Sequence, residues 1–159
     1  MKKEKNPFEP FLDLSAILTG FDRVDLLGTG MVEPFFDEVV NVIGEAISHE
    51  LWETTAQIVG RYGKDEKRLE AAIRREILAS AKFGPVARNI IQMWYTGIWN
   101  ELPQSWRDLY GTNPNDTTRI ISSEAYQQGL VWEVIGAHPP AAKQPGFASW
   151  SYPPSGDKH

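Results

Sequence analysis

The C-terminal stretch from Tyr126 to Pro154 limits the fold of this chain more than any other segment. It begins with a helical pattern, but its prolines exclude regular secondary structure beyond about residue 137, and its glycines loosen the backbone further. The stretch is nevertheless rich in aromatic side chains, which favour burial and are rare in disordered tails. We therefore expect an extended arm over about 137–159 that lies on a surface, either of its own body or of another protein.

The remainder of the chain, about 7–136, has the apolar spacing of helices. We expect an all-α fold, a single-domain helical bundle that carries the extended C-terminal arm, so that one domain spans 1–159. The loop GTNPND and a short strand over 117–121 interrupt the helices. The expected helices run from Pro7 to Gly20, from Pro34 to about Gly63 with Gly44 as an undecided break, from Lys64–Asp65 to Gly84, from Pro85 to Ile98, and from a Ser122 or Ser123 cap through Val131.

Composition excludes several functional classes. The formal charge of −5 argues against nucleic acid as a partner, because no basic face is available to neutralise phosphates. The chain has no cysteine, which excludes disulfides, thiolate catalysis and most structural zinc sites. No segment approaches the roughly 20 apolar residues of a membrane span, so we expect no direct membrane span. The N-terminal residues include three lysines but no clean apolar run. The chain is therefore either cytoplasmic or has lost a leader.

Candidate catalytic and metal-binding residues are few. His49 lies in HELWE, which lacks the second histidine of the metalloprotease motif H-E-x-x-H because its fifth residue is Glu53. We expect His49 on a solvated helix face, and Glu45, Glu50 and Glu53 on related helical faces that form a solvated acidic surface rather than a metal site. His138 lies in a proline corner and is expected to be a turn residue. The sequence thus offers no catalytic, cofactor-binding or metal-binding constellation.

The aromatic run WYTGIW, from Trp94 to Trp99, has two interpretations. Such a cluster can stack on a sugar or a flavin, but it is more often part of a core or an interface. We expect the second, with Ile90, Ile91 and Trp94 buried within the subunit.

Three segments resemble one family of proteins. They are FLDLSAILTGF (Phe11 to Phe21), GPVARNIIQMWYTGIW (Gly84 to Trp99) and the stretch from Ile121 to Pro154. Together, and in this order, they resemble the small subunit of membrane-bound, flavin-dependent sugar and polyol dehydrogenases, such as those for sorbitol, fructose and glucose. The chain departs from the family in lacking a twin-arginine leader, and in Ala141, Ala142 and Ala148, where the family often has glycine.

The resemblance implies a specific role. The small subunit pairs with a large catalytic subunit of the glucose–methanol–choline type, which carries FAD and performs the oxidation, and a cytochrome subunit takes the electrons onward. The small subunit binds no cofactor itself; it supports folding of the large subunit and its export to the periplasm, where partners hold the complex at the membrane. The residues that select the sugar belong to the other chain.

The sequence therefore leaves three alternative functions for this chain. The first is a non-catalytic small subunit of such a dehydrogenase, and the second is a free-standing helical escort that contacts the flavoprotein only transiently. The third and weakest is an enzyme that uses His138 with the aromatics of WYTGIW.

The arm also has two destinations. We expect it to bind the large subunit, with Trp150 and Tyr152 as anchors, whereas the rival is that it folds back on its own helices. The residues expected to bind the large subunit are His138, Pro139, Pro145, Phe147, Trp150 and Tyr152.

Overall fold

The structure, a computed structural model, describes residues 6–136 of the 159-residue chain. Helices dominate this part of the chain, so the all-α fold class expected from the sequence is confirmed. In chain order the elements are α1 (Glu9–Thr19), α2 (Arg23–Gly28), α3 (Val32–Ile43), α4 (Glu45–Tyr62), α5 (Glu66–Ile73), the π-helical turn η1 (Arg74–Leu78), α6 (Gly84–Thr96), β1 (Ile98–Trp99), α7 (Gln104–Tyr110), β2 (Arg119–Ile120), α8 (Ser123–Gln127) and α9 (Leu130–Val134).

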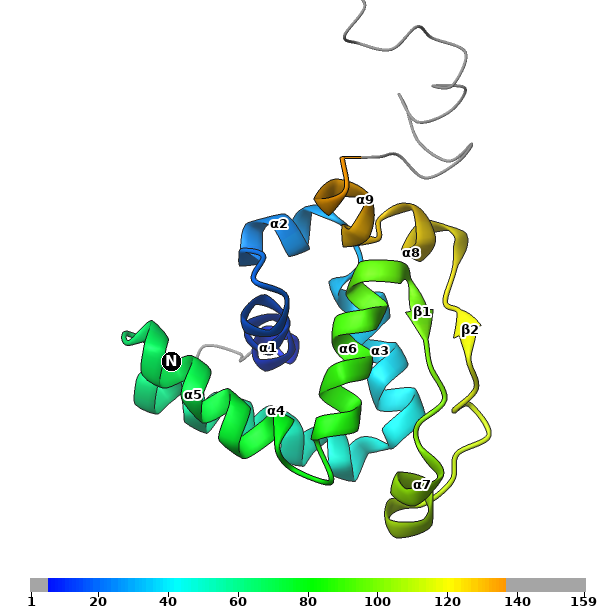
Figure 1. Cartoon of the computed structure of the whole chain (residues 1–159), viewed down its shortest axis with the longest axis horizontal. Coiled ribbons are helices and arrows are strands. Elements are labelled where there is room, and N and C mark those ends of the chain that lie inside the picture. Colours follow the sequence, from blue (N-terminus) through cyan, green and yellow to red (C-terminus); the bar gives the residue numbers. More distant parts are fainter. Residues whose placement is uncertain (1–5, 137–159) are drawn as a thin grey trace, which may run out of the picture.

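Helix α6 is the central element of the arrangement (Figure 1). It packs against α1, η1, β1, α8 and α9. The α4–α5 pair projects from the body at the left of the view, while α2, α8 and α9 gather at the top. Helix α7 lies at the opposite end, where the Trp106 indole donates a hydrogen bond of 2.8 Å to the backbone oxygen of Lys82.

Local sequence signals set several helix ends as expected. Gly20 ends α1 in the left-handed conformation at φ 75°, which glycine adopts without steric cost. The Asp65 carboxylate caps α5 by accepting a 3.2 Å hydrogen bond from the backbone N–H of Arg68. The Ser122 hydroxyl caps α8 in the same way through the N–H of Ala125. These ends depend on a few neighbouring residues alone.

Gly44 divides the long apolar pattern of residues 34–63 into two helices. Its backbone, at φ 84° and ψ 163°, lies in a region that side-chain-bearing residues rarely adopt. The chain therefore turns between α3 and α4, and the two helices pack against each other. The break that the sequence left undecided is thus a real one.

Aromatic side chains fill the centre of the molecule. Phe11 is fully buried, and its ring centroid lies 5.4 Å from that of Trp52 and 6.2 Å from that of Trp94. Phe35 meets Trp94 edge to face at 4.8 Å, and Phe36 stacks on Trp52 at 5.6 Å. Edge-to-face and offset pairs of this kind add about 0.5–1.5 kcal/mol each beyond their buried area. Four helices, α1, α3, α4 and α6, are therefore joined through rings.

The last helical segment does not run unbroken through Val131 as expected, but splits into α8 and α9 around Gly129. A Cβ atom at Gly129 would lie 2.7 Å from the backbone oxygen of Tyr95. Only a residue without a side chain allows the chain to approach α6 so closely. The break is therefore a packing requirement.

The segment between Asp65 and Gly84 also differs from the expected single helix. After α5 the backbone widens into the π-helical turn η1, and Gly84 is the first residue of α6 instead of a helix end. A Cβ atom at Gly84 would lie 2.5 Å from the backbone oxygen of Leu78, so glycine lets α6 start directly against η1. Helix α7 and the short helix α2 were not expected at all.

A two-stranded antiparallel ladder closes one side of the fold. Ile98 pairs with Ile120 and Trp99 with Arg119, so a short strand lies within 117–121 as expected. Arg119 forms an ion pair with Glu38 of α3. The ladder therefore ties the segment after α7 to the body.

We predict that Trp94→Ala lowers the free energy of unfolding by about 3–5 kcal/mol, the usual cost of truncating a fully buried large aromatic. Trp94→Phe should cost less, because it keeps ring contacts and removes an indole N–H that has no hydrogen-bond partner among the described residues. Leu109→Ala is the control, since Leu109 is 71% exposed. Urea unfolding measures all three. A Trp94→Ala protein as stable as the control would show that this face is not packed.

We also predict that Gly129→Ala lowers the free energy of unfolding by about 1–3 kcal/mol, because the added methyl group meets the Tyr95 carbonyl. Gly28→Ala is the matched control, since a Cβ there meets nothing within 4 Å and its backbone has no positive φ. That control should be neutral or slightly stabilising. Equal effects of the two substitutions in thermal unfolding would contradict the prediction.

Candidate interaction surfaces

The residues expected to bind a large subunit lie outside the described residues. They all belong to the arm at 137–159, so their expected role stays a prediction. The set is His138, Pro139, Pro145, Phe147, Trp150 and Tyr152.

The aromatic run WYTGIW belongs to the interior. Trp94 is 1% and Trp99 0% exposed, so neither ring face is available to stack on a sugar or a flavin in this structure. The core interpretation of this run is confirmed for both tryptophans. Ile90 is also buried as expected, whereas Ile91 is only half-buried. The expectation for Ile91 was wrong because its side of α6 faces a groove.

We call this groove the α1–η1–α6 groove. Its lining is mostly apolar, with two charged residues, Glu70 and Arg74. It holds about 170 Å³, which is less than the roughly 300–1,000 Å³ of small-molecule sites. Its size suits a single inserted side chain better than a cofactor. The lining residues are Ile17, Leu18, Ile73, Leu78 and Ile91, with Glu70 and Arg74.

A second hollow lies along α3 alone. Its lining residues, from Pro34 to Asn41, come from this one helix. Since no second element closes it, it has the form of a surface facet rather than a cleft.

The one strongly buried carboxylate among residues 6–136 is Asp116, which is 3% exposed. It accepts hydrogen bonds of 2.9 Å from the Trp99 indole and of 3.0 Å from the backbone N–H of Leu102, and the Arg107 guanidinium lies 3.9 Å away. Charge-assisted bonds of this kind stabilise a buried carboxylate. Its contacts tie the GTNPND loop to β1. Sequence reasoning missed it, because an aspartate in such a loop has the composition of a turn.

His49 and its acidic neighbours form no site. The His49 side chain is 79% exposed and lies 3.8 Å from the Glu53 carboxylate one turn further on. Glu50 is bound to the Lys82 ammonium at 2.6 Å. Within residues 6–136, no group of three or more metal-binding side chains is placed to hold an ion. The expectation of a solvated face at His49 is confirmed.

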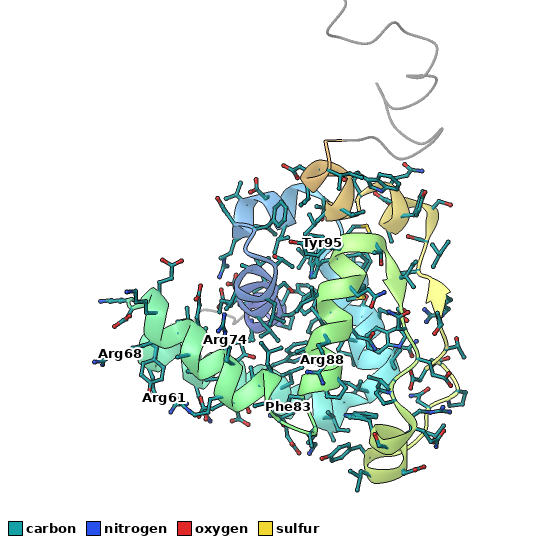
Figure 2. The ribbon with its side chains drawn as sticks, viewed as in Figure 1. Arg61, Arg68, Arg74, Phe83, Arg88 and Tyr95 are labelled. Atoms are coloured by element: carbon teal, nitrogen blue, oxygen red, sulfur yellow. The ribbon has the colours of Figure 1, made fainter. Side chains whose placement is uncertain are left out.

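Charge is unevenly distributed along the described chain. Residues 6–60 contain ten carboxylates and one arginine, whereas residues 61–75 contain six lysines and arginines and three carboxylates. Figure 2 shows Arg61 and Arg68 toward the projecting end of the α4–α5 pair. We call this segment, residues 61–75, the basic end. The two segments therefore carry charge of opposite sign.

A small ion cluster joins α1 to α2. The Arg23 guanidinium binds the carboxylates of Glu9 and Asp13. Burial nevertheless raises the pKa of Asp13 above its ordinary 3.8, and outweighs the opposing attraction of Arg23. The hydrogen bond to Glu9 is the main cause that raises the pKa of Arg23. A raised pKa disfavours the charged form of Asp13 but favours that of Arg23, and burial dominates only at Asp13, whose side chain is 24% exposed against 42% for Arg23.

Among residues 6–136, the helices are all too short or too polar to cross a membrane. Comparisons of the chain with models of protein families, with curated proteins and with solved structures give no match.

The raised pKa of Asp13 predicts a pH dependence. The folded protein holds the Asp13 proton at pH values above 3.8 where the unfolded chain has released it, so this residue's contribution to stability falls as pH rises through that window. The difference in unfolding free energy between wild type and Asp13→Asn should therefore decline as pH rises above 3.8.

Arg23→Gln is the control for this pH series. Without the guanidinium, burial of Asp13 is unopposed, and the decline should be steeper. A difference that instead grows with pH would mean that the ion pair with Arg23 outweighs burial. Denaturant unfolding at a series of pH values gives the result.

Proposed function

We propose that this chain is a non-catalytic small subunit of a heteromeric FAD-dependent sugar or polyol dehydrogenase. It supports the folding, stability or export of a large flavoprotein of the glucose–methanol–choline type, which carries the FAD. In this role the subunit works in the periplasm and reaches the membrane through its partners, among them a cytochrome subunit.

The observation that carries the proposal is the spatial meeting of the three segments that resemble the family. The first segment lies in α1 and the second in α6 and β1, and they meet where Phe11 stacks on Trp94. The Tyr95 hydroxyl also donates a 3.1 Å hydrogen bond to the backbone oxygen of Thr19. Segments distant in sequence thus form one packed layer.

The described part of the third segment joins the same layer. The backbone N–H of Ile121 donates a 2.9 Å hydrogen bond to the oxygen of Gly97. Gly129 lies directly against the backbone of Tyr95. The resemblance therefore falls on segments that pack together, as expected if one structural unit is shared.

The position of the aromatic residues agrees with an accessory role. Trp94 and Trp99 of the second segment are used for the core, so resemblance in this segment reflects packing. A subunit of this kind offers a stable shape to another protein, and a permanent complex buries on the order of 2,000 Å² or more.

We predict that a large flavoprotein of the glucose–methanol–choline type is encoded beside this chain, and that co-expression of the two yields a one-to-one complex on size-exclusion chromatography at micromolar concentration. Flavin absorbance should follow the large subunit. The isolated chain should carry no stoichiometric flavin and should not reduce dye with glucose, fructose or sorbitol. Yellow isolated chain would overturn the proposal.

Two variants sharpen the co-expression experiment. Trp94→Ala, which disrupts the core, should lower the yield of FAD-loaded flavoprotein, whereas Leu109→Ala at an exposed position should not. Separate elution of the two chains with an unchanged yield would contradict the proposal. Separate elution with a yield that still depends on Trp94 would favour the free-standing escort.

A further inference from the structure

Exposed apolar side chains gather on two short helices. Helix α2 presents Val24 and Leu27, 77% and 54% exposed and spaced three residues apart on one face. Helix α9 ends with Val134 and Ile135, 60% and 62% exposed. We call these four residues the α2–α9 face. They are most of the large apolar residues that are exposed in the described part of the chain, and large apolar groups of this kind mark contact surfaces.

Residues just before each helix contact Tyr95, which lies at the C-terminal end of α6 (Figure 2). The ring of Phe21, just before α2, lies 6.2 Å from the Tyr95 ring. Gly129, just before α9, lies against the Tyr95 backbone. The two halves of the α2–α9 face are therefore at one end of the molecule, as Figure 1 also shows.

The chain that continues from this end has the composition to cover it. Ile135 and Gly136 are the last described residues, and residues 137–159 follow with Phe147, Trp150 and Tyr152. Phe147 is far enough along the chain to reach roughly 35 Å in an extended conformation. Helix α2 lies at the same end of the molecule as α9, from which the segment continues (Figure 1). The aromatics can thus reach either half of the face.

The charges near the α2–α9 face also favour residues 137–159 as the segment that covers it. Asp22 and Asp25 at α2 and Glu133 on α9 are exposed, and none has an ion-pair partner among residues 6–136. The segment 137–159 carries two lysines and one aspartate, a small positive excess. An apolar face edged with unpaired carboxylates suits an aromatic segment that brings cations.

We propose that residues 137–159 fold back on the α2–α9 face of their own chain in the free subunit. Their aromatics cover Val24, Leu27, Val134 and Ile135. A tethered segment acts at an effective concentration on the order of millimolar, which a second copy of the chain does not reach in dilute solution. The prolines of the segment reduce the entropy lost on docking. In the free subunit, the exposed face favours the chain's own body over the large subunit, the other destination that the sequence leaves open.

The test uses the full chain alone, so its result is independent of any flavoprotein. The chain has no cysteine, and two can therefore be introduced as Val24→Cys with Ser151→Cys. Under mild oxidation at low protein concentration, an intramolecular disulfide should form readily, and non-reducing electrophoresis measures its rate. The geometric control is Leu109→Cys with Ser151→Cys, because Leu109 is equally exposed but lies on α7 at the other end of α6.

The decisive control separates docking from tethering. The Val24→Cys and Ser151→Cys pair is repeated with Phe147→Ser and Trp150→Ser, which leave the described body untouched. Loss of the aromatics should slow the disulfide by about tenfold or more, since only the tether then brings the cysteines together. An unchanged rate would overturn the proposal, as would disulfides formed mainly between two chains. Ending the chain at Gly136 should also lower the melting temperature.

Discussion

The contact between Phe11 and Trp94 is the interaction on which the rest of the structure depends. It joins α1 to α6, and the same two rings engage Trp52 of α4 and Phe35 of α3. Of the later elements, β1, α8 and α9 also pack against α6. The Trp52 and Trp94 indole N–H groups have no hydrogen-bond partner among the described residues. The core therefore gains apolar contact from these large rings despite the polar cost of burying them.

Much of the fold follows from signals that act over a few residues. The cap at Asp65, the left-handed Gly20 and the stripe that buries Ile90 and Trp94 were all predicted from the sequence, and the structure confirms them. Each depends on backbone preference or on helical periodicity. Neither requires knowledge of which distant segment lies opposite.

Features that depend on distant partners could not be predicted. Gly129 interrupts a helical pattern because the backbone of Tyr95 lies against it, and no signal near Gly129 reveals this. Asp116 resembles a turn residue until its indole and amide donors are in place. The α2–α9 face escaped notice because α2 lies beside turn-forming glycines. The expected partner-binding residues belong to 137–159, outside the described residues, so the structure neither supports nor opposes their assignment.

The charge of the basic end can affect how fast the molecule associates with a partner, apart from any contact it makes. Ten carboxylates and one arginine lie in residues 6–60, whereas residues 61–75 hold six lysines and arginines and three carboxylates, so the two parts of the chain differ in the sign of their charge. In the electric field of a charged protein or surface, a molecule with separated charges is oriented before contact. Its encounters with that partner are then biased toward one orientation. This bias acts on the rate of association more than on the strength of the final complex. It weakens as added salt shortens the Debye length, which is about 8 Å at physiological ionic strength.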